Sequence, residues 1–347
     1  MKRPLFMESK GDLVLLSWNH PELTRPCVES LCANTTVPAR LIIIDQGSDE
    51  ETRNYLKSLR STPHLTIDLL WNPFNVGYPK GMNQGLSKST APFVCFLNND
   101  VLVPPGWLEE LIFVAESDPS IGLVNPASNT FGIYPTPGTD WRRLAEESGT
   151  RHGQWVEVRY GEGFCLLGKR EVLLKVGGFD ETIYEQIYFE DADLGRKIQA
   201  QGLRCVMARG TYVWHEGGQT MSARPERLRL FQENERRFIR KWGKGERLLY
   251  ALTTSSADRL RELGEQARAE ANRSGQVWIL VDSHPASKEL PQHLGIRTSR
   301  LPEWQIPWVA LWKALTKKKK FDRIVTDVGW LRLILKPLRF LHHATID

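Results

Sequence analysis

Apolar residues in the first hundred positions fall into short runs, each of which ends in polar residues. Leu13–Ser17, Leu41–Ile44, Thr66–Trp71 and Phe93–Leu97 have the length and the branched or aromatic side chains of buried strands. Segments of helical character separate these runs, the first over Pro21–Asn34. Strand, helix and strand in this order predict parallel strands joined by right-handed crossovers. We therefore expect an α/β fold, Rossmann-like, with a mostly parallel sheet flanked by helices.

The pattern changes twice further along the chain. Pro126–Gly153 is rich in Gly, Pro, Ser and Thr and indicates a long loop of the kind that often carries recognition. A charged helix over Pro225–Trp242 is expected to close the domain. We predict one domain over 1–245, a helical linker over 246–274, and a small α/β appendage or truncated second domain over 275–347. This appendage has too few predicted strands for an independent sheet.

Polar side chains follow the predicted strands where those strands end. Ser17 and Asn19 close the first run, Asp45 closes the second, and Asn98–Asp100 close the fourth. Ligands of parallel α/β sheets bind beyond the carboxyl ends of the strands, so we expect a site there. A carboxylate at this edge suits a hard divalent cation, which makes Asp100 a candidate metal ligand. The same triplet is also a common polar turn.

A second group of acidic residues stands at the start of a predicted helix. Glu190, Asp191 and Asp193 can cap that helix, or one of them can act as a base toward an attacking hydroxyl. His215 follows a short apolar run and precedes Gly217-Gly218, so it is a candidate for contact with a metal or phosphate. A single histidine is more often a plain surface or core group.

Two further polar residues have two interpretations each. Lys80 can pair with a diphosphate through its ammonium group, or it can be an exposed, solvated lysine. Asn83 can contact a donor, or its side chain can hold a loop in place of a backbone partner.

Composition narrows the function classes only slightly. Hydrophobic residues make up 41% and charged residues 25% of the 347 positions, which is typical of a folded protein and not of disorder. The net charge of +5 is too small and dispersed to indicate a nucleic-acid partner. Five cysteines without a CxxC pair indicate reduced thiols.

No secretory signal and no apolar run of about 18 residues is visible, so we expect a cytoplasmic protein. Trp330–His342 alternates apolar residues with Arg332, Lys336 and Arg339. This segment can be a basic amphipathic helix on the inner face of a membrane, or a docking helix with a basic outer side, which is the commoner case.

Together these motifs resemble glycosyltransferase family 2, closest to its rhamnosyltransferase-like and polysaccharide-forming branches. The resemblance extends over residues 12–242. The matching motifs in order are Ser17-Trp18-Asn19, Ile44-Asp45-Gln46-Gly47-Ser48, Asn75-Val76-Gly77 with Asn83-Gln84-Gly85, Asn98-Asn99-Asp100, Gly178-Phe179-Asp180, Glu190-Asp191-Ala192-Asp193-Leu194 and His215-Glu216-Gly217-Gly218.

The resemblance implies a GT-A fold, a nucleotide-diphosphate sugar donor, a divalent metal (Mn²⁺ or Mg²⁺) and inversion at the anomeric carbon. Asp45 matches the acid that helps to hold the nucleotide base, with Ser17 and Asn19 near the same pocket. Asp100 matches the last residue of the DXD motif, in which Asn98 replaces the first Asp. Asp191 matches the catalytic base, and His215 a residue that contacts metal or diphosphate.

The implied donor site includes Lys80, Asn83, Asn98 and Asn99. Gln46 stands where the family often has Asp or Asn, so UDP-, dTDP- and GDP-linked sugars all stay open. The acceptor is expected to be a saccharide, a glycolipid or a glycoprotein, in a pathway such as assembly of a bacterial surface glycan.

Two other functions compete with transfer. The chain can be a nucleotide-sugar-binding or scaffolding module of a larger glycan-assembly complex, since fold alone does not fix activity. A nucleotidyltransferase also uses acidic residues and metal, but no Gly-rich phosphate loop with a lysine follows the first strand. Asp100 and Asp191 favour catalysis, provided that they face each other across one cleft.

Overall fold

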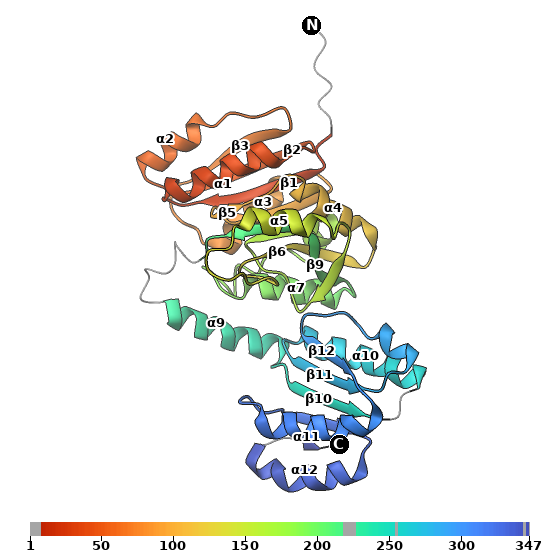
Figure 1. The fold of residues 1–347 in the computed structure, drawn as a ribbon. Helices are drawn as coiled ribbons and strands as arrows, with labels where there is room; N and C mark the ends of the chain where they lie inside the picture. The colour runs from red at the N-terminus through yellow and green to blue at the C-terminus, as the bar shows by residue number, and fades with distance from the viewer. Residues whose placement is uncertain (1–7, 218–226, 254–255, 343–344, 347) are drawn as a thin grey trace. The chain divides into compact units, whose positions relative to one another are not determined.

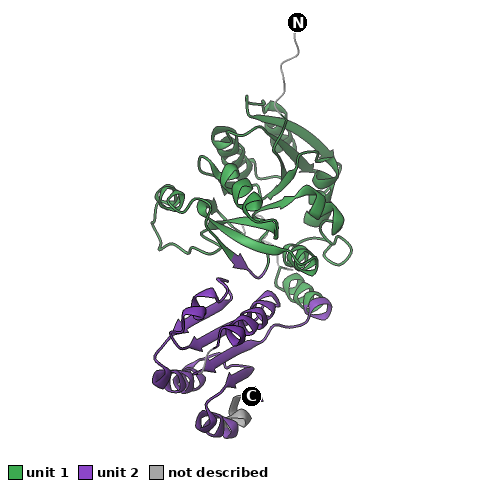
Figure 2. Ribbon diagram, turned by 90° about the vertical axis from the view of Figure 1, so that its right-hand side faces the viewer, with its two compact units in different colours: residues 1–156, 160–238 green, residues 157–159, 239–347 purple. Residues whose placement is uncertain are grey.

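The computed structural model describes residues 8–217, 227–253, 256–342 and 345–346. The chain divides into two compact units, residues 1–156 with 160–238, and residues 157–159 with 239–347 (Figure 2). The long helix α9 (Arg227–Trp242) carries the chain from the first unit into the second. Among the described residues, no helix combines the length and the apolar character needed to cross a bilayer.

The first unit is built on a nine-stranded sheet (Figure 1). Eight of the strands follow the order β3-β2-β1-β4-β8-β6-β9-β5. β1 pairs in parallel with both β2 and β4, so Leu13 lies opposite Leu41 and Cys95. β8 pairs antiparallel with β4. The strands are β1 (Gly11–Ser17), β2 (Ala39–Gln46), β3 (Leu65–Asn72), β4 (Phe93–Leu97), β5 (Val101–Leu102), β6 (Ile121–Ser128), β7 (Trp155–Val158), β8 (Cys165–Lys169) and β9 (Arg204–His215).

Burial explains why these runs form strands. β1, β2 and β4 are buried almost throughout, as parallel strands covered on both faces must be. β3 lies at the edge and is partly exposed. The helices of this unit are α1 (Pro21–Asn34), α2 (Glu50–Ser58), α3 (Tyr78–Lys88), α4 (Trp107–Ser117), α5 (Trp141–Gly149), α6 (Arg170–Lys175) and α7 (Glu190–Ala200). The predicted α/β class and mostly parallel sheet are confirmed.

Helix α3 packs closely on β1 because two of its residues have no side chain. A Cβ atom on Gly85 would stand 2.2 Å from a methyl group of Val14, and one on Gly81 would stand 2.4 Å from Nε2 of Gln46. Both distances are shorter than a normal van der Waals contact. The two glycines therefore set how near the start of α3 comes to the carboxyl end of β1.

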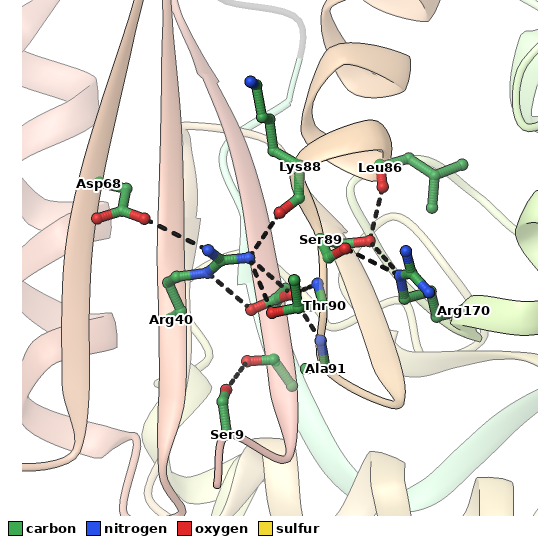
Figure 3. Close-up of polar contacts among 11 residues, drawn as sticks. Ser9, Arg40, Asp68, Leu86, Lys88, Ser89, Thr90, Ala91 and Arg170 are labelled. Carbon is green, nitrogen blue, oxygen red and sulfur yellow. Dashed lines mark hydrogen bonds and ion pairs between the residues drawn. The ribbon is translucent and has the colours of Figure 1, made fainter. Parts of the chain in front are cut away.

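A buried ion pair holds the opposite edge of the sheet, where the strands begin (Figure 3). Asp12 on β1 is fully buried and accepts two hydrogen bonds of 3.0 Å from the guanidinium of Arg40 on β2. The same carboxylate accepts from the backbone N–H groups of Thr90 and Ala91. Every oxygen of Asp12 has a partner, so this network fastens strands and is separate from the polar groups at the carboxyl ends.

The second unit contains a parallel five-stranded sheet in the order β12-β11-β10-β13-β14. Side chains of β10 alternate between two cores. Leu248 and Tyr250 pack with α10, whereas Leu249 and Ala251 pack with α11 and α12. The elements are β10 (Arg247–Leu252), α10 (Ala257–Asn272), β11 (Gln276–Val281), β12 (Ile296–Arg300), α11 (Ile306–Thr316), β13 (Arg323–Thr326), α12 (Gly329–His342) and β14 (Thr345–Ile346).

This unit differs from the expectation of a linker followed by a small appendage. The segment 246–274 contains β10, which is the central strand of the sheet, and α10, which covers one face of it. The predicted boundary near residue 245 therefore lies close to the observed change of unit at Ile239, and the described residues of 246–274 belong to the second unit rather than to a linker. Likewise, the segment 126–153 expected as a loop contains the helix α5.

Candidate functional site

The loops that follow β1 and β2 are tied together by Asn19. Its backbone N–H donates to Oγ of Ser48 at 2.9 Å, and its Oδ1 accepts from the backbone N–H of Asp49 at 2.9 Å. Asn19 has a φ of 53°, in the left-handed region that asparagine tolerates better than most residues. The side chain thus shapes the edge of the predicted site through contacts within the protein.

Asp45 lies at the end of β2, beside Ser17 of β1. The Asp45 carboxylate is buried, accepts from the backbone N–H of Ser48, and forms an ion pair of 3.3 Å with Nε of Arg53. Ser17 is opposite Asp45 in the strand register. Its hydroxyl oxygen is buried and has no hydrogen-bond partner within the described chain. A buried hydroxyl without a partner is unusual and marks a place where a ligand can supply one.

Asp100 and His215 are brought together by the pairing of β5 with β9. Val101 lies opposite His215 in that pairing, so the residue before Val101 reaches the imidazole. Nε2 of His215 is 3.3 Å from Oδ1 of Asp100, and Oδ2 of Asp100 accepts from the backbone N–H of Gly217 at 3.2 Å. Asn98 places its amide nitrogen 3.3 Å from the same Nε2. Gly218, the next residue of this motif, lies outside the described residues.

The surroundings of His215 fix the direction of its ring. Its Nδ1 is 3.1 Å from the hydroxyl of Thr130, and the ring stacks on Phe164 with 5.2 Å between centroids. When Nδ1 donates its proton to Thr130, the lone pair of Nε2 faces Oδ1 of Asp100, which is buried without a hydrogen bond among the described residues. In this tautomer Nε2 accepts a hydrogen bond from the side-chain amide of Asn98, and a bound cation would supply a partner for Oδ1 of Asp100.

A divalent cation fits this donor set in part. One carboxylate oxygen and one imidazole nitrogen are ligands that Mn²⁺ accepts. Within the described ranges, no group of three or more His, Cys, Asp or Glu residues could hold a metal. The remaining ligands would therefore have to be water or oxygen atoms of a bound phosphate, which is how Mg²⁺ sits in many phosphate-binding sites.

Asp191 lies in the first turn of α7, after a strained turn of the backbone. Tyr188 and Phe189 have φ values of 78° and 70°, which bulky residues rarely adopt. Such strain persists only where the surrounding structure enforces it, often at functional sites. The Asp191 carboxylate accepts from the backbone N–H of Gly163 at 2.9 Å and of Ala192 at 2.7 Å.

The segment Gly163-Phe164 joins the two acidic groups of the site. Gly163 donates its N–H to Asp191, and the carbonyl of Phe164 accepts from the backbone N–H of Asn98 at 2.9 Å. The ring of Phe164 stacks on His215. This two-residue segment therefore contacts Asp191 directly, and it is connected to Asp100 through His215.

Two further residues border Asp191, namely Glu190, which was one of the three candidate bases, and Tyr78, which the sequence interpretation did not single out as functional. The hydroxyl of Tyr78 donates to the carbonyl of Gly163 at 2.8 Å. Burial, together with the charges of Glu190 and Asp191, raises the pKa of Tyr78 well above its ordinary value. Burial and then the neighbouring Asp191 raise the pKa of Glu190 well above its ordinary value.

Two of the three other residues predicted to contact the donor form hydrogen bonds within the protein. Asn83 accepts from the backbone N–H of Phe179 and donates to its carbonyl, both at 2.9 Å, which is the loop-holding alternative. Asn99 donates to the hydroxyl of Thr24 on α1. Lys80 is exposed on α3. These three residues are not joined to the Asp100–Asp191 group by the contacts described above.

Gln46, which raised the question of base recognition, is buried and holds a loop. Its Oε1 accepts from the side chain of Asn72 and from the backbone N–H of Val76, and its Nε2 donates to the carbonyl of Gly77. This glutamine therefore orders the segment that leads into α3.

The sequence of the chain is similar to a known protein family and to several of its members. Residues 12–177 match the model of glycosyl transferase family 2. Over 233 residues the chain is 29% identical to the O-antigen biosynthesis protein RfbC of Myxococcus xanthus, covering 62% of this chain and 18% of that protein. Over 172 residues it is 30% identical to a pre-mycofactocin glycosyltransferase of Mycobacterium tuberculosis, covering 48% of this chain and 35% of that protein. The chain thus spans only a minor part of either relative.

Among solved structures, the chain is similar to the mannosyltransferase PcManGT from Pyrobaculum calidifontis in complex with GDP-Man and Mn²⁺. The TM-score is 0.49 with 18% identity, covering 69% of this chain and 66% of that one.

Proposed function

We propose that the chain, whose residues 12–177 match glycosyl transferase family 2, transfers a sugar from a nucleotide-diphosphate donor to a hydroxyl group, with inversion at the anomeric carbon. The observation that carries the proposal is the shared support of Asp191 and the Asn98–His215 group by Gly163-Phe164. A base and a phosphate-binding group near one another are what a direct displacement requires.

In the proposed step, the acceptor oxygen attacks the anomeric carbon from the face opposite the leaving group. The new bond between carbon and acceptor oxygen forms while the bond from carbon to the diphosphate oxygen breaks, and the electron pair leaves with the diphosphate. The proton of the acceptor hydroxyl passes to the Asp191 carboxylate. Of these two neighbouring carboxylates Glu190 is buried and Asp191 is partly exposed, so we assign Asp191 as the group that accepts the proton.

The backbone contacts of Asp191 support a positioned base. Its carboxylate receives N–H groups from Gly163 and Ala192, which fix the plane of the carboxylate relative to β8 and α7. Asp193, two positions later, is fully buried and lies 3.9 Å from Nζ of Lys197. This difference in exposure favours Asp191 over Asp193 as the group that meets an acceptor.

Asp100 and His215 are the residues that would hold a divalent cation, Mn²⁺ or Mg²⁺. Such a cation supplies positive charge that stabilises the departing diphosphate. The chain's own contribution is the fixed orientation of both ligands, through Gly217 on the carboxylate and Thr130 on the imidazole. Contacts of this kind hold the tautomer and direction of metal-binding histidines.

The nucleotide is proposed to lie at the ends of β1 and β2. Asp45 and the unpartnered Ser17 hydroxyl offer an acceptor and a donor for a nucleoside there, in a wall shaped by Asn19. UDP, dTDP and GDP all present groups that could bind. For the acceptor we favour a saccharide or glycoconjugate, a choice supported by the name of the O-antigen biosynthesis relative.

Replacement of Asp191 tests the proposal. Asp191→Asn keeps the shape of the side chain and one of its two hydrogen-bond acceptors but removes the basic group, so we expect at least about a 100-fold loss of transfer or donor hydrolysis. Binding of UDP, dTDP or GDP with Mn²⁺, measured as thermal stabilisation, should be retained. Asp68→Asn, an exposed site on β3, is the matched control and should keep full turnover.

Each of the following results would contradict part of the proposal. Full turnover in Asp191→Asn would exclude this carboxylate as the base. Equal loss of nucleotide binding and turnover would assign Asp191 a structural role. Nucleotide binding by the unchanged chain, with no turnover of any donor, would favour the alternative of a nucleotide-sugar-binding or scaffolding module.

A further inference from the structure

Helix α11 turns its largest side chains outward and its smallest inward. Ile306, Ala310 and Ala314 pack into the core of the second unit, whereas Trp308 and Trp312 are each 60% exposed. The helix is apolar around most of its circumference. A helix of that kind is normally covered on all sides. In the described part of the chain, nothing covers the side of α11 that carries the tryptophans.

Helix α12 extends the same uncovered surface. Leu331 and Leu335 enter the core, while Leu333 is 71% exposed and Trp330 and Ile334 are partly exposed. The rings of Trp308 and Trp330 lie 5.1 Å apart, so the two exposed surfaces are continuous. Figure 1 shows both helices together beside the sheet of this unit. We define the tryptophan face as Trp308, Trp312, Leu315, Trp330, Leu333 and Ile334.

Positive charge is concentrated in the segment of the chain that carries the tryptophan face. Between positions 303 and 336 the chain has eight Lys or Arg residues and only three Asp or Glu residues. Lys313 lies 5.8 Å from the ring of Trp312, and Lys317–Lys320 follow at the end of α11. Burial, followed by the nearby charges of Lys317 and Arg297, lowers the pKa of Lys313.

We propose that the tryptophan face binds the surface of a bilayer that contains anionic phospholipids. Tryptophan is favoured at the boundary between headgroups and acyl chains, where one part of the ring is apolar and its N–H can meet water. Lysines around it are attracted to anionic headgroups. α11 has 11 residues, too few to span the roughly 30 Å of hydrocarbon, so it would lie in the plane of the surface.

A second copy of the chain is a poorer occupant of this face. In a symmetric dimer the same surface meets itself, so Lys313 and Lys317–Lys320 of one copy would approach those of the other. Like charges brought together across an interface oppose association. An anionic lipid surface meets the same lysines with opposite charge. This inference does not depend on the proposed transfer activity.

Vesicle binding by the full chain tests the inference. We expect the chain to sediment with vesicles of phosphatidylcholine and phosphatidylglycerol (3:1), and at least about tenfold more weakly with phosphatidylcholine alone. Trp308→Ala with Trp312→Ala should weaken binding to the anionic vesicles by at least about tenfold. Both side chains are mostly exposed, so circular dichroism and thermal unfolding should show a folded variant.

The contribution of charge needs its own variant with a matched control. Lys318→Gln, Lys319→Gln and Lys336→Gln together should weaken binding by at least about tenfold, and 0.5 M salt should do the same to the unchanged chain. Lys57→Gln, Lys88→Gln and Lys175→Gln remove three exposed charges from the first unit and should leave binding unchanged.

Three results would overturn the inference. The first is no binding to anionic vesicles at low salt. The second is binding that neither the tryptophan nor the lysine variant reduces. The third is a concentration-dependent dimer, seen by light scattering without lipid, that the tryptophan variant abolishes, because a second copy would then be what covers this face.

Discussion

Two histidines show how differently one side chain is used in the two units. His215, in the first unit, faces the carboxylate of Asp100 and stacks on Phe164. His293, in the second unit, is buried, accepts from the N–H of Gly295 through Nδ1, and lies 3.2 Å from Oδ1 of Asn272 through Nε2. The first arrangement suits a ligand, whereas the second suits a neutral imidazole that belongs to the core.

The environment of His293 makes the stability of the second unit sensitive to pH. Burial, together with the charges of Arg268 and Arg159, lowers the pKa of His293 from 6.5 to about 4. Between these values the unfolded chain binds a proton that the folded chain does not. The free energy of unfolding therefore falls as the pH drops from 6.5 toward 4, by about 2 kcal/mol at pH 5 from this group.

Unfolding midpoints at pH 7.5 and pH 5 measure this effect. His293→Asn should lower stability at pH 7.5, because hydrogen bonds within the core are lost, and should reduce the difference between the two pH values. His64→Gln, an exposed control in the first unit, should keep the full difference. An unchanged pH dependence in His293→Asn would show that another group is responsible.

At the scale of elements, the approach of α3 to β1 places the start of that helix. Gly85→Ala would put a Cβ atom 2.2 Å from Cγ1 of Val14, so the helix or the strand must move. We expect a loss of about 1–3 kcal/mol in the free energy of unfolding, as for other overpacked cores. Gly149→Ala on α5, where an added Cβ meets no atom within 4 Å, is the matched control and should be neutral or slightly stabilising.

Thermal unfolding of the two glycine variants decides this point. A Gly85→Ala protein as stable as the unchanged chain would mean that the contact between α3 and β1 adapts without cost. The position of Tyr78, the first residue of α3, would then not be set by that contact.

The sequence pattern predicted the elements of the first sheet because its central strands are buried on both faces. Such strands are continuous apolar runs, and Asp45 and Asp100 could be assigned to their ends by position alone. The roles of Glu190 and Tyr78 could not be predicted in this way. Their altered pKa values depend on burial against Asp191 and Gly163, which tertiary packing alone decides.

The second unit illustrates the opposite case at the scale of the whole molecule. β12 (Ile296–Arg300) is polar at most positions and β14 has two residues, so neither has the apolar run of a buried strand. Only the pairing with β11 and β13 makes them part of a sheet. The same unit carries the tryptophan face, whose apolar side chains are exposed in the described chain. The hydrophobic pattern alone would wrongly predict that these side chains are buried.

The proposed mechanism requires one arrangement in the first unit, with a cation beside Asp100 and His215 and a base at Asp191 facing the same ligand. Crystals of the chain with Mn²⁺ and the nucleoside diphosphate that stabilises it most would test this directly. We predict an anomalous peak for manganese bound to Asp100 and His215, with the diphosphate between that ion and the Asp191 carboxylate. Manganese bound elsewhere, or an Asp191 carboxylate shielded from the diphosphate by protein atoms, would contradict the proposed mechanism.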